Sequence, residues 1–154
     1  MWSALAHRIP LGCCYFLLTS LHLPPPLNLS MTPKADWARA AGASVCVVGL
    51  LMTLWARCTL GGNWNSAVTF KQGHELIRTG PYRLVRHPIY TGLLVMALGT
   101  ALDFGQLRCW LALPLIAAAF WIKLKREEKL LLRHFPDEYP AYQEQVKALV
   151  PFVI

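Results

Sequence analysis

Long apolar blocks alternate with polar, basic segments along this chain. Residues 36–56 form one apolar run with a polar entrance, and this run is long enough to span a bilayer. Small residues crowd its first half, and small residues let membrane helices approach closely. Residues 88–122 hold two apolar arms, each slightly short of a full span, with Asp103, Gly105 and Gln106 between them. This interruption predicts a tight helical hairpin.

The remaining segments complete a prediction of a single membrane domain over residues 1–154. A short apolar run at 10–23 precedes a proline-rich loop, and we expect a retained membrane helix there because no small-residue cleavage site follows it. Residues 57–87 are polar and read as a cytosolic loop, whereas residues 123–154 read as a charged, partly helical cytosolic segment. We therefore predict an all-α integral membrane protein with about four membrane segments.

Composition and charge support a membrane location. Of the 154 residues, 55% are hydrophobic and only 15% are charged, whereas soluble domains carry about 25% charged residues. The net charge of +7 comes from basic residues that gather beside the apolar runs, as the positive-inside rule expects. No groove-binding motif accompanies them, so we expect no nucleic-acid partner.

The basic residues also predict the orientation. The segments 57–87 and 123–133 are the richest in Lys and Arg, and they flank the hairpin, so both should lie on the cytosolic face. This orientation places both termini in the cytoplasm. The small size and the lack of sorting signals favour a bacterial inner membrane.

The five cysteines carry no chemistry that the sequence can identify. They are Cys13, Cys14, Cys46, Cys58 and Cys109, and none has CxxC or Cys/His metal spacing. We expect unpaired packing residues, without a disulfide, zinc or another metal.

Two polar clusters lie at the end of the predicted hairpin opposite its tip, one before the first arm and one after the second. The first is "HELIRTGPYRLVRHPIY" and the second is "KLKREE". Taken alone, the first is compatible with interfacial anchoring of a helix end, and the second with a solvated helix whose charges pair locally. Because the arms of a hairpin are antiparallel, both clusters should lie on one face, where they form a candidate site.

The order and spacing of both clusters resemble the isoprenylcysteine carboxyl methyltransferase family of membrane enzymes. The matching pieces are "LGGNWNS" (60–66), "HELIRTGPYRLVRHPIYTG" (74–92), "REEKLLLRHFPDEYPAY" (126–142) and "VPFVI" (150–154). The resemblance covers the chain from Trp55 to its C-terminus. Phospholipid N-methyltransferases are similar at a greater distance.

The resemblance implies S-adenosylmethionine as the cofactor, bound at the cytosolic face by the loop before the hairpin and by the C-terminal segment. Glu127 would face the positive amino or sulfonium group, which is a favourable ion pair in a partly dry site. In the eukaryotic enzymes an arginine four residues before this glutamate meets the substrate, whereas here the position is Lys123. The full set of implied cofactor-binding residues is His74, Glu75, Leu76, Ile77, Tyr82, His87, Pro88, Ile89, Tyr90 and Glu127.

Three functions are compatible with this pattern. The first is methylation of a membrane-embedded, lipid-like or prenylated carboxylate, which is already ionised at neutral pH and needs only alignment and a nearby cation, namely Lys123, Arg126 or Arg86. The second is methylation of a lipid amine, for which Glu128 or His87 would have to remove a proton. The third is a small membrane scaffold that keeps the fold without catalysis.

Overall fold

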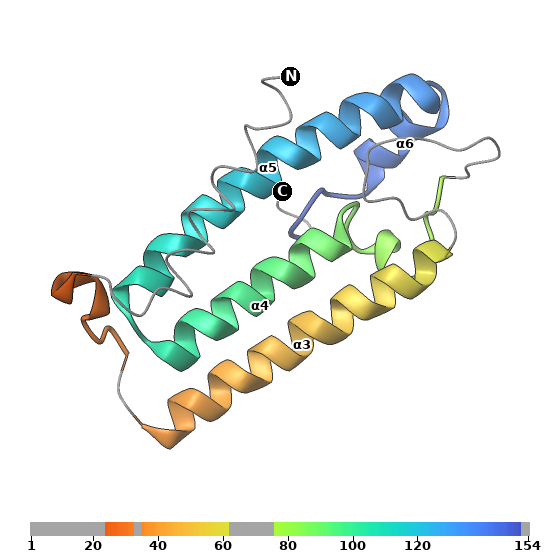
Figure 1. The fold of residues 1–154 in the computed structure, drawn as a ribbon. Helices are drawn as coiled ribbons and strands as arrows, with labels where there is room; N and C mark the ends of the chain where they lie inside the picture. Colours follow the sequence, from red (N-terminus) through yellow and green to blue (C-terminus); the bar gives the residue numbers. More distant parts are fainter. Residues whose placement is uncertain (1–23, 33–34, 62–75, 152–154) are drawn as a thin grey trace.

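Three long helices form the body of the molecule. The computed structural model describes residues 24–32, 35–61 and 76–151, and these residues are helical with no strand beyond one isolated bridge. Helix α4 lies between α3 and α5 (Figure 1). The helices are η1 (Pro25–Asn28), α3 (Asp36–Leu60), η3 (Gly80–Arg83), α4 (Pro88–Phe104), α5 (Leu107–His134) and α6 (Glu138–Gln145). The all-helical prediction is confirmed for these residues, and the predicted helix at 10–23 lies outside them.

Two helices extend further than their apolar runs. Helix α3 continues to Leu60, beyond the predicted end at residue 56. Helix α5 is continuous from Leu107 to His134, so the charged segment that we expected to begin at residue 123 is the second half of one helix. The reason is local: residues 123–134 consist of Lys, Arg, Glu, Leu and His without glycine or proline, and most of these are good helix formers. Pro136 follows shortly after the helix end.

The hairpin tip lies where the sequence predicted it. Helix α4 ends at Phe104, and Gly105 adopts a left-handed conformation with φ of 62°, which glycine adopts without steric cost. The segment after η1 is hydrogen-bonded to this tip, since the Met31 amide donates to the Gly105 carbonyl at 2.6 Å and the Leu107 amide donates to the Leu29 carbonyl at 2.9 Å. These bonds close the end of the helix layer that lies away from α6 (Figure 1).

Glycines bring α3 and α4 into close contact. A Cβ atom added to Gly42 would lie 2.8 Å from the carbonyl oxygen of Gly99, and one added to Gly49 would lie 2.6 Å from that of Gly92. Both distances are shorter than any van der Waals contact, so only glycine fits at these positions. The prediction of close approach is thus confirmed at Gly42, whereas the other small residues of that stretch, Ala40, Ala41, Ala43 and Ser44, face outward.

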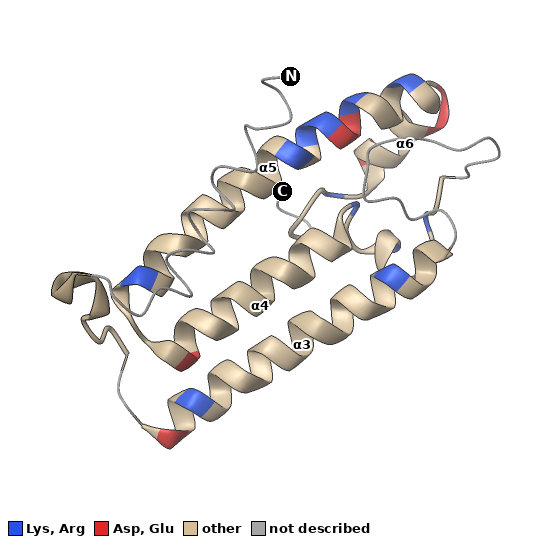
Figure 2. Ribbon diagram, in the orientation of Figure 1, with Lys and Arg blue, Asp and Glu red and all other residues tan. Residues whose placement is uncertain are grey.

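The outer surface of the helix layer is apolar in its middle. Charged residues occupy the ends of the three long helices and the second half of α5, and none lies between these regions (Figure 2). Large apolar side chains of α3, such as Val48 and Leu51, are 60% exposed. By length and composition, α3 and α5 could each cross a membrane, and α4 is a shorter apolar helix. A lipid environment would cover these side chains.

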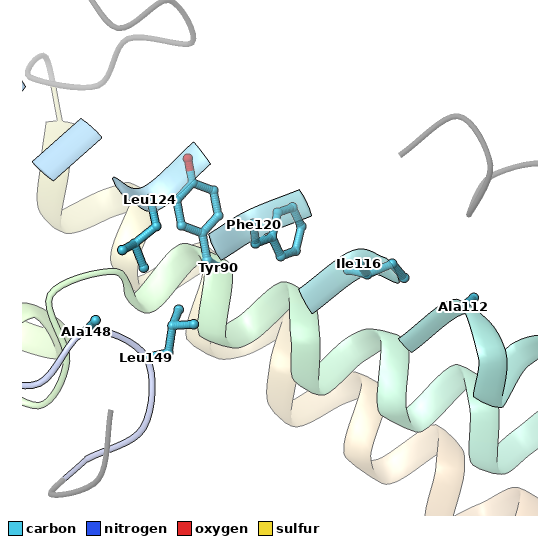
Figure 3. Packing of buried hydrophobic residues seen from close by; sticks show 7 residues of the cluster. All are labelled: Tyr90, Ala112, Ile116, Phe120, Leu124, Ala148 and Leu149. Atoms are coloured by element: carbon cyan, nitrogen blue, oxygen red, sulfur yellow. The ribbon is translucent and has the colours of Figure 1, made fainter. Parts of the chain in front are cut away.

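A buried cluster joins α5 to the C-terminal segment. Side chains spaced four residues apart on α5 line one face of this helix, as packing through a single stripe requires. Tyr90 of α4 and Leu149 of the C-terminal segment lie against this stripe (Figure 3). The cluster consists of Tyr90, Ala112, Ile116, Phe120, Leu124, Ala148 and Leu149. It anchors the start of α4, where the first polar cluster ends.

Candidate functional site

The segment before α4 is compact, with its aromatic and imidazole side chains buried. Residues Gly80–Arg83 form the 3-10 helix η3, and Pro88 occupies the first turn of α4, where a missing N–H costs no hydrogen bond. His87 is the residue before this proline and has an extended φ of −124°. Tyr82, His87 and Tyr90 are each less than a tenth exposed. They lie at the foot of α4, on the side of the polar half of α5.

The two polar clusters meet at this point. The Arg86 guanidinium donates to Glu128 Oε1 from Nε at 3.1 Å and from Nη2 at 2.5 Å. The Tyr90 hydroxyl donates to Glu127 Oε1 at 2.5 Å. The expectation that the hairpin brings "RHPIY" and "REE" together is therefore confirmed.

Glu128 is a buried, ionised carboxylate. We take residues 107–122 as the membrane-spanning part of α5, and Glu128 lies beyond it with only 4% of its surface exposed. Burial opposes its ionisation, but the adjacent His87 and Arg86 side chains outweigh burial and lower the pKa of Glu128 to about 2. Lys125 Nζ lies 3.5 Å from its other oxygen. This carboxylate is therefore fully engaged within the protein.

Glu127 is the more accessible carboxylate of the pair. Its side chain is 23% exposed, and Lys123 Nζ lies 4.0 Å from Oε1. His87 Nδ1 lies 3.8 Å from Oε2. The Lys123 ammonium also lies over the Tyr90 ring, 5.4 Å from its centroid, as in a cation–π contact. Glu127 thus faces a partly open position bordered by one cation and two rings.

Stacked rings separate this polar position from the apolar core. The Tyr90 ring lies 5.7 Å from the His87 ring and 5.1 Å from the Phe120 ring, and both pairs are stacked. Figure 3 shows Tyr90 beside Phe120, with its hydroxyl at the end of the ring that points away from Leu149. One ring therefore contacts the apolar stripe of α5 with its face and Glu127 with its hydroxyl.

The other residues that the sequence proposed are buried or half-buried, or lie outside the described part of the chain. Burial, followed by the Tyr142 and Glu127 charges, raises the pKa of Tyr82. Pro88 is fully buried. Four further candidates, namely Leu76, Ile77, Ile89 and Arg126, are half-buried. His74 and Glu75 lie outside the described residues.

Sequence reasoning placed the C-terminal segment at the site but did not name two of its tyrosines. Tyr139 is 1% exposed and Tyr142 is 3% exposed, and the Tyr142 hydroxyl donates to the Tyr82 carbonyl at 2.5 Å. Burial raises the pKa of Tyr142 to about 12, so this hydroxyl keeps its proton at physiological pH. The signal was present in "EYPAY", because two tyrosines three residues apart share one helix face.

The described residues fit a cofactor that carries a positive charge. His87 is buried between the two carboxylates, with Nδ1 3.8 Å from Glu127 Oε2 and Nε2 3.6 Å from Glu128 Oε1. Glu127 supplies a partly exposed negative charge, and the His87–Tyr90 stack supplies flat apolar surface. The positive sulfonium and amino groups of S-adenosylmethionine would complement the Glu127 charge, and its adenine ring would complement the stacked rings.

Comparison with known proteins gives a consistent result. The family model for isoprenylcysteine carboxyl methyltransferases (ICMT) matches residues 42–133. Protein-S-isoprenylcysteine O-methyltransferase of Tribolium castaneum is 32% identical over 126 residues, which cover 78% of this chain and 44% of that protein. The Rattus norvegicus protein of the same name is 30% identical over 123 residues, which cover 78% of this chain and 43% of that protein. The chain thus spans less than half the length of these two relatives.

A plant relative and a solved structure extend the match. The probable protein-S-isoprenylcysteine O-methyltransferase of Oryza sativa subsp. indica is 30% identical over 135 residues, with 86% of this chain and 71% of that protein covered. The structure of a eukaryotic intramembrane Ras methyltransferase, ICMT, is similar with a TM-score of 0.64 and 27% identity, covering 98% of this chain and 51% of that chain. The family match spans α4 and most of α5, including Tyr90 and both glutamates, and we conclude that this chain belongs to the isoprenylcysteine carboxyl methyltransferase family.

Proposed function

We propose that this protein transfers a methyl group from S-adenosylmethionine to the carboxylate of a membrane-embedded, prenylcysteine-like acceptor. The observation that carries the proposal is the convergence of Tyr90 and His87 with Glu127 at one end of a helical hairpin, beside an apolar cluster. Membership of the family supports the same activity. The two alternatives, a lipid-amine methyltransferase and a non-catalytic scaffold, have less support.

In this proposal the segment before α4 and Glu127 hold the cofactor. When bound, S-adenosylmethionine supplies a methyl group on a positively charged sulfonium. Glu127 would balance a positive group of the cofactor, while His87, whose Nδ1 lies 3.8 Å from Glu127 Oε2, would contact one of the polar groups. The full proposed set is the one that the family resemblance implies: His74, Glu75, Leu76, Ile77, Tyr82, His87, Pro88, Ile89, Tyr90 and Glu127.

Lys123 is the cation that we propose for the acceptor carboxylate. Its side chain is 29% exposed, and Nζ lies 4.0 Å from Glu127 Oε1 and 5.4 Å from the centroid of the Tyr90 ring. A lysine holds a carboxylate as a point charge and lacks the fork of an arginine. Arg126 is half-buried on the same helix and is a second candidate for this role.

The engaged state of Glu128 argues against its use as the base that an amine acceptor would require. A carboxyl acceptor is ionised at neutral pH, so methyl transfer to it needs alignment and exclusion of water but no base. An amine acceptor is protonated at neutral pH and needs a base. Glu128 is a weak proton acceptor for that purpose, because its pKa is lowered to about 2 and Arg86 occupies one of its oxygens.

We further propose an integral membrane protein with four membrane segments, of which residues 10–23 are the first. The basic residues near the site, including Lys125 and Arg86, favour a cytosolic location for it. Both termini would then lie on the cytosolic side. A bacterial inner membrane as the location stays a prediction from the sequence.

The decisive experiment is a methyl-transfer assay with the purified chain in nanodiscs. Methyl-labelled S-adenosylmethionine would be incubated with a small prenylcysteine analogue, with the same analogue amidated at its carboxyl group, and with extracted lipids. We expect label in the free acid only, and alkali should release it as methanol because a methyl ester is hydrolysed by base. Alkali-stable label in lipid amines, or no transfer to any acceptor, would overturn the proposal.

A further inference from the structure

The C-terminal segment is held against the start of α4 by a series of hydrogen bonds. We call residues 138–149 the C-terminal strap. The amides of Arg86 and His87 donate to the carbonyls of Lys147 and Ala148 at 2.8 and 3.0 Å. The Thr91 hydroxyl donates to the Leu149 carbonyl at 2.7 Å. The strap therefore pairs with the backbone that carries the candidate cofactor residues.

The Arg86 side chain connects this strap to α5. Its Nη1 donates to the carbonyl of Gln143 at 3.1 Å and also to that of Val146. Its Nε and Nη2 both donate to Glu128 Oε1. Four of the five N–H groups of this guanidinium are thus used within the protein, and the side chain is 10% exposed.

This arrangement leaves Arg86 poorly suited to bind an acceptor carboxylate. A bidentate carboxylate contact needs two parallel N–H groups of the guanidinium, whereas Arg86 would have to release Glu128 or the strap to offer them. Releasing Glu128 would leave a buried charge with fewer partners, which is costly. The sequence alone had placed Arg86 among the candidate cations for the acceptor.

The same contacts couple the strap to the carboxylate that faces the site. Glu128 and Glu127 are neighbours on α5, so fixing the first restrains the helix turn that carries the second. His87 follows Arg86 and lies between the two carboxylates, 3.8 Å from Glu127 and 3.6 Å from Glu128. Tyr139 of the same strap is 1% exposed, and burial, followed by the Glu128 charge, raises its pKa.

We propose that Arg86 is a positioning residue that latches the C-terminal strap to α5 and thereby holds His87 and Glu127 in place for the cofactor. It acts through its contacts with Glu128 and the strap and does not touch the acceptor. The cofactor part of this inference rests on the proposed function, whereas the strap part rests on the hydrogen bonds alone.

The molecule contains a matched control for this latch. Arg78 also connects the segment before α4 to the strap, because its Nη2 lies 2.6 Å from Glu138 Oε2. The Arg78 and Glu138 side chains are 39% and 62% exposed, however, and exposed ion pairs contribute little. Arg78→Gln therefore removes this exposed pair and the cation–π contact of Arg78 with the Tyr142 ring, 5.8 Å from its centroid, but leaves the buried Arg86–Glu128 network intact.

The test measures amide hydrogen exchange and cofactor binding on the full chain in nanodiscs. The exchange rates of the Arg86 and His87 amides show directly whether the strap is bound, because both amides donate to strap carbonyls. The amides of Leu84 and Val85 donate to Pro81 and serve as an internal reference. Binding of S-adenosylhomocysteine, the demethylated cofactor, is measured in parallel by calorimetry.

We expect Arg86→Gln to raise the exchange rate of the two reporter amides at least about tenfold. The same change should weaken S-adenosylhomocysteine binding by about tenfold, whereas Arg78→Gln should leave both close to wild type. Arg86→Lys should rescue only part of each effect, because lysine can reach Glu128 or the strap carbonyls but not both.

Two further variants keep the test decisive if Arg86→Gln fails to fold. Arg86→Gln combined with Glu128→Gln removes both charges, so no buried charge is left unpaired. Thr91→Val removes the bond to the Leu149 carbonyl without any change of charge. Both variants should raise the amide exchange rates of residue 86 and His87 relative to those of the Leu84 and Val85 amides.

The possible outcomes separate the two proposals. Wild-type exchange in every folded variant, or equal effects of the Arg86 and Arg78 changes, would overturn the latch. Faster exchange with unchanged cofactor affinity would show that the strap is not coupled to the site. Weaker affinity with unchanged exchange would show that Arg86 contacts the cofactor directly, which also overturns the proposal. If the wild-type chain binds no S-adenosylhomocysteine, the proposed function fails, while the exchange data still decide whether the strap is latched.

Discussion

Gly99→Ala should destabilise the packing of α3 against α4 while leaving the candidate site intact. The added methyl group would lie 2.6 Å from the Cys46 amide nitrogen and 2.7 Å from the Gly42 carbonyl oxygen. Both are backbone atoms of α3, so no side-chain rotation can relieve the overlap. Gly99 lies more than two helical turns from Tyr90 along α4, so the site itself should be little affected.

The structure sets the size of the expected effect. The two distances are roughly 1 Å shorter than the usual contact distance of about 3.5 Å, and overpacking of this kind costs about 1–3 kcal/mol. Because backbone atoms are involved, we expect a cost of about 2–3 kcal/mol, in the upper part of that range. Replacing glycine by alanine inside a helix recovers about 1 kcal/mol. The net loss is therefore about 1–2 kcal/mol, or roughly 2–8 °C in Tm for a chain of this size.

Thermal unfolding in a fixed detergent, followed by circular dichroism, measures this loss. Val48→Ala is the matched control, because Val48 is 60% exposed on the outer side of α3 and makes no part of the glycine contact. Its midpoint should stay close to that of the wild type. A Gly99→Ala protein as stable as the wild type would show that α3 and α4 do not pack through their glycines.

Four further predictions concern the site. Gly92→Ala, whose methyl group would lie 2.7 Å from the Gly49 carbonyl oxygen close to Tyr90, should lower both the unfolding midpoint and S-adenosylmethionine affinity, measured by thermal unfolding and calorimetry. Tyr90→Phe keeps the ring but removes the hydroxyl that donates to the site carboxylate, so calorimetry should detect roughly five- to tenfold weaker cofactor binding. Lys123→Ala should raise the acceptor KM at least about tenfold, whereas Lys123→Arg should lower this KM, because arginine can clamp a carboxylate; a methyl-transfer assay over a series of acceptor concentrations checks both. Because the pKa of Glu128 is lowered in the folded protein, its contribution to stability should be complete above about pH 4.5 and be lost as the pH falls toward about 2; unfolding midpoints over this range should show a weaker acid dependence in Glu128→Gln.

The family and the main elements could be predicted from local sequence. The apolar runs, the polar hairpin tip at Gly105 and the stop at Pro136 depend on composition and on short spacings, which a single sequence displays directly. The meeting of "RHPIY" with "REE" followed from the antiparallel arms of a hairpin. The continuity of α5 through residue 123 was missed, because the boundary was drawn where hydropathy changes, although the local helix propensity does not change there.

The role of Arg86 and the packing of the glycines were decided only by the tertiary structure. Helix α4 is apolar on every side, so its sequence does not indicate which face meets α3 and which meets α5. Arg86 contacts Glu128 and Val146, which are 42 and 60 residues away along the chain. Such contacts depend on how each helix is rotated about its axis and on where the C-terminal strap returns. The sequence by itself determined which segments are apolar, helical or charged. The folded arrangement determined that Glu128 is buried in ion pairs within the protein, whereas its neighbour Glu127 remains partly exposed.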